Sequence, residues 1–339
     1  MHVASILACG LLCSAASAQT SRPLNVLYIM DDQHNPRMLG LDSNGFGGVP
    51  VSLTPNLDLL AAQGVRFSHA YTSAPQCMPE RLSLLTGRFP HEHGLRWNNI
   101  WEPARGELTL PALARRHGYF TGTIGKNHLF WLDQPDLRVT DHGFDRVQDR
   151  ADYVEFCGDN GVPPYFANGN HWRMDGISLS AGYTFNTNRF HTSGYFSDQA
   201  IDFLENRAGP GGDGKPFVLW LSFDGPHPPI LPSGPADPND WAHRYHPFSQ
   251  LALPANLGKV ADTSRLQQLQ AQYAHMSAEE HREALSYYYG LVSQIDFNIG
   301  RVLTRLGELG LDDRTVVVFT ADHGEYAGEM ACWTKGGGS

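Results

Sequence analysis

The sequence is short of positive charge, and this shortage excludes two classes of partner. Its 339 residues contain 25 Lys and Arg against 35 Asp and Glu, and the formal net charge is −10 at pH 7. Long-range repulsion of this kind opposes approach to nucleic acid or to an anionic membrane surface. We therefore expect no nucleic acid and no membrane as partners, and any anionic substrate must enter a locally positive cleft.

Near the N-terminus the sequence has only a short apolar run, Val3–Leu12, which cannot span a bilayer. Ala16-Ser17-Ala18 follows this run, a pattern typical of a signal peptide cleaved before Gln19. We expect residues 1–18 to be this signal peptide and residues 19–339 to be one exported domain, either periplasmic or secreted. A buried first strand or helix is the alternative.

Cysteine is scarce, and the count limits disulfide bonding. Of five cysteines, Cys9 and Cys13 would leave with a signal peptide. Three then remain, an odd number that cannot form a closed set of disulfides, so at least one thiol needs another role. Cys157 and Cys332 could pair in an oxidising compartment, but the sequence does not show how far apart they lie, and this pairing stays open.

Apolar residues make up 41% of the chain and gather in runs typical of buried strands that end at acidic residues. These runs are Leu24–Met30 before Asp31 and Asp32, Phe217–Leu221 before Asp224, and Thr315–Phe319 before Asp322. Helical patterns separate them, at Asn56–Gln63, Leu110–His117, Ser197–Asn206 and Ser277–Leu309. The alternation predicts an α/β domain with a largely parallel sheet between helix layers. In open sheets of this kind, ligands bind at the carboxyl ends of the strands.

Two stretches lack the periodicity of helix or strand. Residues 152–194 are rich in Gly, Asn and aromatic residues, and residues 226–254 are rich in Pro, His and Trp. We expect both to be surface segments without regular structure. Segments of this kind often shape the access of a substrate to its site.

One short motif gives Cys77 a role. The segment Cys77-Met78-Pro79-Glu80-Arg81 resembles the Cys-x-Pro-x-Arg signature of type I sulfatases, in which an enzyme oxidises the cysteine to formylglycine. The resemblance continues in the family's order through Asp31-Asp32, Gly125–His128, Pro226–Pro228 and Thr320–Glu325. The chain is therefore similar to the formylglycine-dependent sulfatases of the alkaline phosphatase-like superfamily.

Two positions depart from the family's pattern. Glu80 stands where the family most often has serine or another small residue, and we expect this difference to bear on the rate at which the cysteine is modified. Asn127 stands where tryptophan is common. The key positions of the signature, Cys77, Pro79 and Arg81, are intact.

The resemblance implies a large, mixed but mostly parallel sheet sandwiched between helices, followed by a small C-terminal subdomain. This chain stops at Gly336–Ser339, where the resemblance implies a substrate loop. We therefore expect residues 19–339 to be a sulfatase catalytic domain that is incomplete at its C-terminus and lacks the small subdomain.

The resemblance also implies a divalent metal, held by Asp31, Asp32, the modified Cys77, Asp322 and His323. Carboxylate oxygens suit Ca²⁺ or Mg²⁺ better than a soft metal. Because imidazole is a less usual ligand of calcium, Mn²⁺ is a further alternative to Ca²⁺ at this site.

Roles for the remaining site residues follow from the same resemblance. A hydroxyl of the hydrated formylglycine would attack sulfur, and the second hydroxyl would later allow sulfate to be expelled. His128 would take a proton from this diol, and His227 would donate one to the leaving oxygen. Positive charge around the sulfate would come from Arg81, Lys126 and Lys335.

The substrate would be a small-molecule or glycan sulfate ester, and a formylglycine-generating enzyme would act on the chain during maturation. Phosphonate and phosphate ester hydrolases of the same superfamily share the formylglycine and the metal, so they are one alternative, although Lys126 with His128 favours sulfate. A non-catalytic binding protein that keeps the fold, or an inactive fragment, is the other alternative.

Overall fold

The computed structural model describes residues 23–41, 44–49, 51–98, 107–129, 139–173, 179–208 and 212–335. The predicted signal peptide, residues 1–18, lies outside the described residues. In the described part of the chain, the main sheet has the strand order β3-β2-β6-β1-β7. Its strands are β1 (Asn25–Asp32), β2 (Phe120–Gly125), β3 (Arg146–Gln148), β6 (Phe217–Pro226) and β7 (Thr315–Ala321). A separate antiparallel pair consists of β4 (Gly169–Arg173) and β5 (Ser180–Thr184).

The predicted strands pair in parallel around β1. Leu27 of β1 lies opposite Leu219 of β6 on one side and Val317 of β7 on the other. Leu27 and Ile29 are fully buried, as expected of a strand that is covered on both faces. Because the strands of the main sheet all run parallel, the segments that follow β1, β6 and β7 meet at one edge of the sheet. The predicted α/β fold with a mostly parallel sheet is confirmed.

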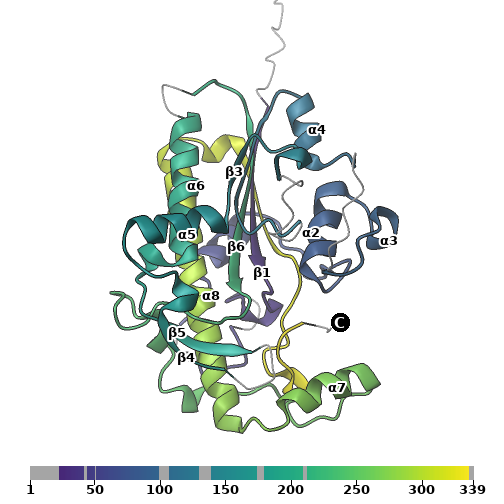
Figure 1. Ribbon diagram of the computed structural model, residues 1–339, viewed down its shortest axis with the longest axis vertical. Coiled ribbons are helices and arrows are strands. Elements are labelled where there is room, and N and C mark those ends of the chain that lie inside the picture. Colours follow the sequence, from purple (N-terminus) through teal and green to yellow (C-terminus); the bar gives the residue numbers. More distant parts are fainter. Residues whose placement is uncertain are drawn as a thin grey trace, which may run out of the picture.

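Helices cover both faces of the sheet (Figure 1). The helices α5, α6 and α8 lie on one side, and α2, α3 and α4 lie on the other. The bounds of the helices are α1 (Pro55–Gln63), α2 (Cys77–Thr86), α3 (Pro90–His93), α4 (Leu110–Arg116), α5 (Arg150–Asp159), α6 (Thr192–Ala208), α7 (Ser264–Tyr273) and α8 (Ala278–Glu308). The predicted helices correspond to α1, α4, α6 and α8, and the sheet therefore lies between two helix layers.

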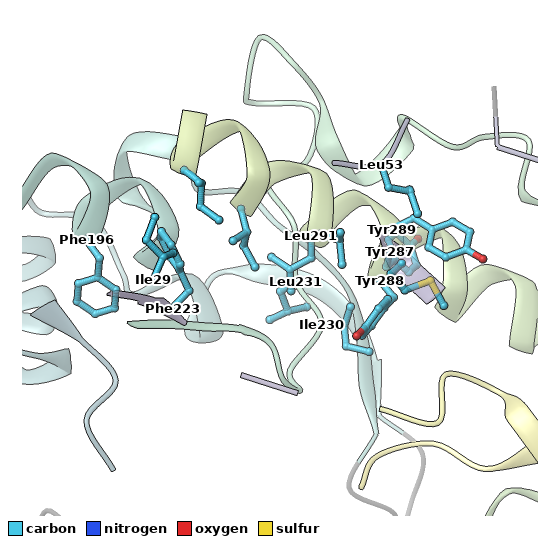
Figure 2. Packing of buried hydrophobic residues seen from close by; sticks show 14 of the residues in the cluster. Ile29, Leu53, Phe196, Phe223, Ile230, Leu231, Tyr287, Tyr288, Tyr289 and Leu291 are labelled. Carbon is cyan, nitrogen blue, oxygen red and sulfur yellow. The ribbon is translucent and has the colours of Figure 1, made fainter. Parts of the chain in front are cut away.

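The 31-residue helix α8 connects the core to the edge of the sheet. Figure 2 shows Tyr288 and Leu291 of α8 among the packed side chains of the core. The Tyr288 hydroxyl donates to the carbonyl oxygen of Gln33 at 2.9 Å and accepts from the amide of Asn35 at 3.0 Å. This buried helix thus fixes the backbone that directly follows β1.

The prediction of an irregular segment at 152–194 was wrong. This stretch contains most of α5, the β4–β5 pair and the beginning of α6. Tyr153 and Cys157 of α5 are fully buried in the main core, where the Phe156 and Tyr195 rings lie 4.9 Å apart between centroids. Packing of aromatic side chains against a neighbouring helix orders this segment, and such packing leaves no periodic signal in the sequence. Residues 227–254 are mostly irregular, as predicted, apart from two short 3-10 turns. The prediction that they lie at the surface was wrong for part of the segment, because Ile230, Leu231 and Tyr245 are buried in the main core.

Cys77, Cys157 and Cys332 are all buried and free, so the pairing of Cys157 with Cys332 that was left open does not occur in this structure.

None of the helices in the described part of the chain combines the length and the apolar character that crossing a bilayer requires.

Candidate active site

Four of the predicted metal ligands meet at the carboxyl edge of the sheet. Asp31 and Asp32 are the last residues of β1, and Asp322 and His323 directly follow β7. Since β1 and β7 are parallel neighbours, with Asp31 opposite Ala321, the two pairs come together at the ends of their strands. All four side chains are buried.

Cys77, the first residue of α2, completes this group. Its Sγ lies 3.2 Å from Nε2 of His323, 3.2 Å from Nζ of Lys335 and 3.9 Å from Oδ1 of Asp32. The side chain of Cys77 is fully buried. The helix that carries the signature motif therefore places its cysteine at the point where β1 and β7 end.

The surroundings of Cys77 favour a negatively charged group. Burial and the Asp32 carboxylate act to raise the pKa of the thiol, but Lys126 and hydrogen bonds with His128 and His227 outweigh them. The pKa of the thiol is therefore below its usual value. The N-terminus of α2 adds to this preference, because the helix dipole is positive there.

Arg81 lies one turn after Cys77 on the same side of α2. Its buried guanidinium places Nη2 3.0 Å from Oδ2 of Asp32 and Nε 3.0 Å from Oδ2 of Asp322. Nη1 donates to the Lys126 carbonyl oxygen at 2.6 Å. Arg81 thus fixes the two carboxylates, from neighbouring strands, in relation to the helix that carries Cys77.

The donor set fits a hard divalent cation. Single ligand atoms of four buried residues lie within 4.8 Å of one another, and these residues are Asp32, Cys77, Asp322 and His323. Asp31 lies beside this group, with Oδ2 2.8 Å from Nδ1 of His34 and with Oδ1 buried and lacking a hydrogen-bond partner among the described residues. A buried carboxylate oxygen without a partner is costly, and a cation at this point would satisfy it.

Two lysines bring positive charge to the same point. Nζ of Lys126 forms a salt bridge with Oδ2 of Asp32. Burial would raise the pKa of Asp32, but the surrounding cations, chiefly Lys126, hold that pKa well below its usual value. Nζ of Lys335 lies 2.9 Å from Nε2 of His227 and donates to Oε1 of Gln33 at 3.0 Å.

His128 completes the set of predicted site residues. Its imidazole hydrogen-bonds with Cys77, and burial lowers the pKa of the ring. The imidazole is therefore neutral near neutral pH and can accept a proton. The structure thus brings every predicted catalytic residue to the edge of the sheet where the predicted metal ligands lie.

Glu80, which departs from the signature, holds the loop that precedes Cys77. Its Oε2 accepts from the Ser73 amide at 2.7 Å, from the Ser73 hydroxyl at 2.5 Å and from the Ala74 amide at 3.2 Å. These three bonds involve the segment just before the helix. The carboxylate therefore has a structural function in positioning the chain that leads to Cys77.

A cleft with a volume of about 1020 Å³ opens beside this site, and His227 and Lys335 contribute to its lining. The floor of the cleft denotes the set Asp32, Cys77, Arg81, Lys126, Asp322 and His323. The lining of the cleft includes residues that sequence reasoning missed, among them Gln33, Arg96 and Arg265. Gln33 directly follows the Asp31-Asp32 pair, and this adjacency could have identified it. Arg96 and Arg265 belong to no motif, and only the fold brings them to the cleft.

Two features define the class of this protein. One is a parallel sheet between helix layers, and the other is a buried group of carboxylate, thiol and imidazole side chains at the carboxyl edge of that sheet. The solved structures described below share this fold, so the class is defined at the level of the fold, which is of the alkaline phosphatase-like type. Within that class the chain belongs to the sulfatase family, whose family model matches residues 23–339.

Relatives with assigned names agree with this membership. The chain is 28% identical over 346 residues to an arylsulfatase of Clostridium perfringens, and the alignment covers 92% of this chain and 65% of the relative. It is 30% identical over 310 residues to an ulvan-active sulfatase of Formosa agariphila, and the alignment covers 90% of this chain and 51% of the relative. The chain therefore spans only about half to two thirds of the length of these relatives.

Solved structures show the same fold. A phosphonate monoester hydrolase of Agrobacterium radiobacter matches with a TM-score of 0.71 and 21% identity, over 93% of this chain and 66% of the other. A protein solved with its substrate D-glucosamine-2-N,6-O-disulfate matches with a TM-score of 0.64 and 23% identity, over 92% of this chain and 68% of the other. At these identities the similarity shows the fold alone.

Proposed function

We propose that this chain hydrolyses sulfate esters with a formylglycine made from Cys77 and a divalent cation held beside it. The position of Cys77 carries the proposal, because its Sγ lies 3.2 Å from both His323 and Lys335, one helical turn before the buried Arg81. Membership of the sulfatase family supports it, as do relatives named arylsulfatase and ulvan-active sulfatase.

The cation would be held by Asp31, Asp32, Asp322, His323 and the modified residue 77. Once bound, it would supply Lewis-acid chemistry that draws negative charge from the reacting oxygens. We propose Ca²⁺ for this role, because three of the ligands are carboxylates, with Mn²⁺ or Mg²⁺ as alternatives. Arg81 keeps Asp32 and Asp322 in place for it.

The chain's own residues would move the protons. Hydration of the aldehyde at position 77 gives two hydroxyl groups. One of them loses its proton to solvent, and its oxygen attacks the ester sulfur. The bond between sulfur and the alcohol oxygen breaks, and His227 gives the departing alcohol its proton. His128 then takes the proton of the second hydroxyl, the bond between carbon and the sulfate oxygen breaks, and the aldehyde re-forms as sulfate leaves.

Lys126 and Lys335 would offset the negative charge that moves onto the sulfate oxygens during these steps. The ammonium of Lys335 already contacts Cys77, His227 and Gln33, so it is held at the point where the ester would react. The two lysines approach Cys77 from different segments, one after β2 and one near the C-terminal end of the described chain.

In this proposal residues 1–18 are a signal peptide and residues 19–339 are the catalytic domain, so the protein acts after export, in the periplasm or outside the cell. A formylglycine-generating enzyme would modify Cys77 during maturation. The substrate would be an aryl or carbohydrate sulfate ester.

Turnover of matched esters tests the proposal. The chain, co-expressed with a formylglycine-generating enzyme, would be assayed on para-nitrophenyl sulfate, para-nitrophenyl phosphate and a para-nitrophenyl phosphonate monoester in the presence of Ca²⁺. We expect the highest kcat/KM on the sulfate.

A higher kcat/KM on a phosphorus ester would instead support the second candidate, a phosphonate or phosphate ester hydrolase, which the fold similarity to a phosphonate monoester hydrolase brings into consideration. Turnover of none of the esters by fully modified protein would favour a binding protein of the same fold.

A further inference from the structure

The mouth of the cleft is formed by two segments that carry none of the predicted catalytic residues or metal ligands. One is α7 with its N-cap, Thr263, and the other is the chain segment 96–98 that follows α3. The two segments meet where the guanidinium of Arg265 lies over the indole ring of Trp97, 5.6 Å from its centroid. Trp97 keeps 47% of its surface exposed, so part of this large apolar side chain remains open to a ligand.

Charge at the mouth has one sign. Among the described residues that line the cleft, the ionisable side chains that carry formal charge are Arg96, Arg265 and Lys335, and no Asp or Glu is present. His227 is the other lining side chain that can become positive. In a chain with a net charge of −10, this concentration of positive charge is unexpected unless it serves an anion.

The arginines at the mouth differ from the one below them. Arg81 on the floor is engaged by Asp32 and Asp322 at 3.0 Å each. Arg96 and Arg265 are exposed, and neither has an ion pair within the described ranges. Their charge is therefore available to a ligand that lies in the cleft, whereas the charge of Arg81 already holds the floor together.

We propose that Arg96, Trp97 and Arg265 form a subsite for a second anionic group on the substrate, carried by a ring that packs against the indole. This inference rests on the proposed function, because the first anionic group is the sulfate ester that reacts at Cys77. The substrate class is then an acidic saccharide with a second sulfate or a carboxylate, and a neutral alcohol with a single sulfate is a poorer substrate.

Guanidinium groups suit this task. They bind sulfate and carboxylate oxygens through paired N–H donors, and they remain charged at all relevant pH values. An indole ring offers a flat apolar surface on which a saccharide ring can pack, while its edge stays in contact with water. Arg265 and Trp97 present both kinds of surface at one place.

Binding and turnover of matched ligands test the subsite. Calorimetry with the Cys77→Ala variant measures the affinity for a disulfated disaccharide and for its monosulfated counterpart, without turnover. We expect Arg96→Ala and Arg265→Ala each to reduce the ratio of the two affinities by about threefold to tenfold, as for the loss of one ion pair near the surface. Arg265→Gln, which keeps most of the side-chain stem, should reduce the ratio as well.

Arg116→Ala is the matched control. Arg116 is an exposed arginine at the end of α4, just before β2, and so lies at the amino end of the strands, away from the cleft. Its removal changes the net charge equally and should leave the ratio unchanged. An unchanged ratio in the Arg96 and Arg265 variants, or an equal reduction in Arg116→Ala, would overturn the subsite.

The same ligands separate this inference from the proposed function. If fully modified protein turns over para-nitrophenyl sulfate but shows no preference for the disulfated saccharide that depends on the arginines, the subsite is rejected and the proposed function stands. If no sulfate ester is turned over, while the arginines still set the affinity ratio in the Cys77→Ala variant, the proposed reaction fails and the anion-binding mouth stands.

Discussion

The floor and the mouth of the cleft use arginine in opposite ways. On the floor, Arg81 is buried between Asp32 and Asp322, and its charge is matched by theirs. At the mouth, Arg96 and Arg265 face the cleft without an ion pair in the described part of the chain. A buried network of this kind fixes atoms for one reaction, because breaking it leaves uncompensated charge. Exposed charge costs little and can recognise a ligand, and we therefore propose that the floor serves the reaction and the mouth serves specificity.

The largest expected effect comes from the cysteine on the floor. Cys77→Ala should lower turnover of sulfate esters by about a thousandfold or more, because the residue that becomes the nucleophile is lost. Cys157→Ala removes an equally buried thiol from the core and should leave most of the activity at temperatures where the protein stays folded. Steady-state assays on para-nitrophenyl sulfate measure both. Activity that persists in Cys77→Ala would place the reaction elsewhere.

Removing Arg81 should be the most costly change for stability. Arg81→Ala removes the guanidinium partner of two buried carboxylates, and of these only Asp32 keeps a lysine partner, Lys126. We expect the free energy of unfolding in urea to fall by about 3 to 5 kcal/mol in the presence of a chelator. A saturating divalent cation should restore part of this loss, since it supplies positive charge at the same carboxylates. Arg305→Ala breaks a surface pair with Glu205 and should have a far smaller effect. Equal losses for the two variants would show that the buried ion pairs of Arg81 contribute no more to stability than a surface ion pair does.

Cation binding should depend on the floor carboxylates. With Ca²⁺ at a hundred times its Kd, the wild-type chain should gain about 2.7 kcal/mol of free energy of unfolding, and Asp322→Asn should lose most of this gain. Asp312→Asn, in the exposed turn before β7, removes an equal charge away from the site and should keep it. Thermal melts with and without a chelator measure the difference. A gain that survives in Asp322→Asn would contradict the proposed ligand set.

The contact between Trp333 and His281, close in sequence to Lys335, should make the free energy of unfolding depend on pH. Nε1 of the buried Trp333 donates to Nδ1 of His281 at 3.0 Å, and burial lowers the pKa of His281 to about 4. Because this folded pKa lies below the unfolded value of 6.5, the stabilising effect is complete above pH 6.5 and is lost as the pH falls towards 4.

The wild-type chain should therefore lose about 1.5 kcal/mol relative to His281→Gln between pH 6.5 and pH 5. Glutamine cannot titrate and can still accept the bond from Trp333. Urea unfolding at the two pH values gives the comparison, and a difference between the two proteins that does not change with pH would show that His281 keeps its usual pKa.

The subsite variants at the mouth, with about threefold to tenfold effects on affinity, should give the smallest changes.

The floor could be predicted from the sequence because its residues follow strands directly. Asp31, Asp32 and Asp322 come at the ends of apolar runs, and parallel pairing then brings them together. Cys77 and Arg81 are four residues apart on one helix, a spacing that puts both on the same side. The place of this layer in the fold is therefore readable from local patterns, whereas the roles of its residues are implied by the resemblance to sulfatases.

The mouth could not be predicted in the same way. The helix α7 has a polar sequence in which Leu269 and Tyr273 are its buried residues, so its apolar pattern is too narrow to identify it. Arg265 reaches Trp97 only because α7 folds back over a segment more than one hundred and fifty residues away in the sequence. Contacts of this kind depend on tertiary packing, as does the order of α5 in the stretch predicted to be irregular.

Peptide mass spectrometry across Cys77, after co-expression with a formylglycine-generating enzyme, shows whether this residue becomes the nucleophile. We expect a mass loss that matches conversion of cysteine to formylglycine at Cys77, despite Glu80 in the signature. No such loss is expected at Cys157. If Cys77 remains an unmodified thiol while a sulfatase modified in the same cells is converted, the claim that Cys77 becomes the nucleophile is contradicted.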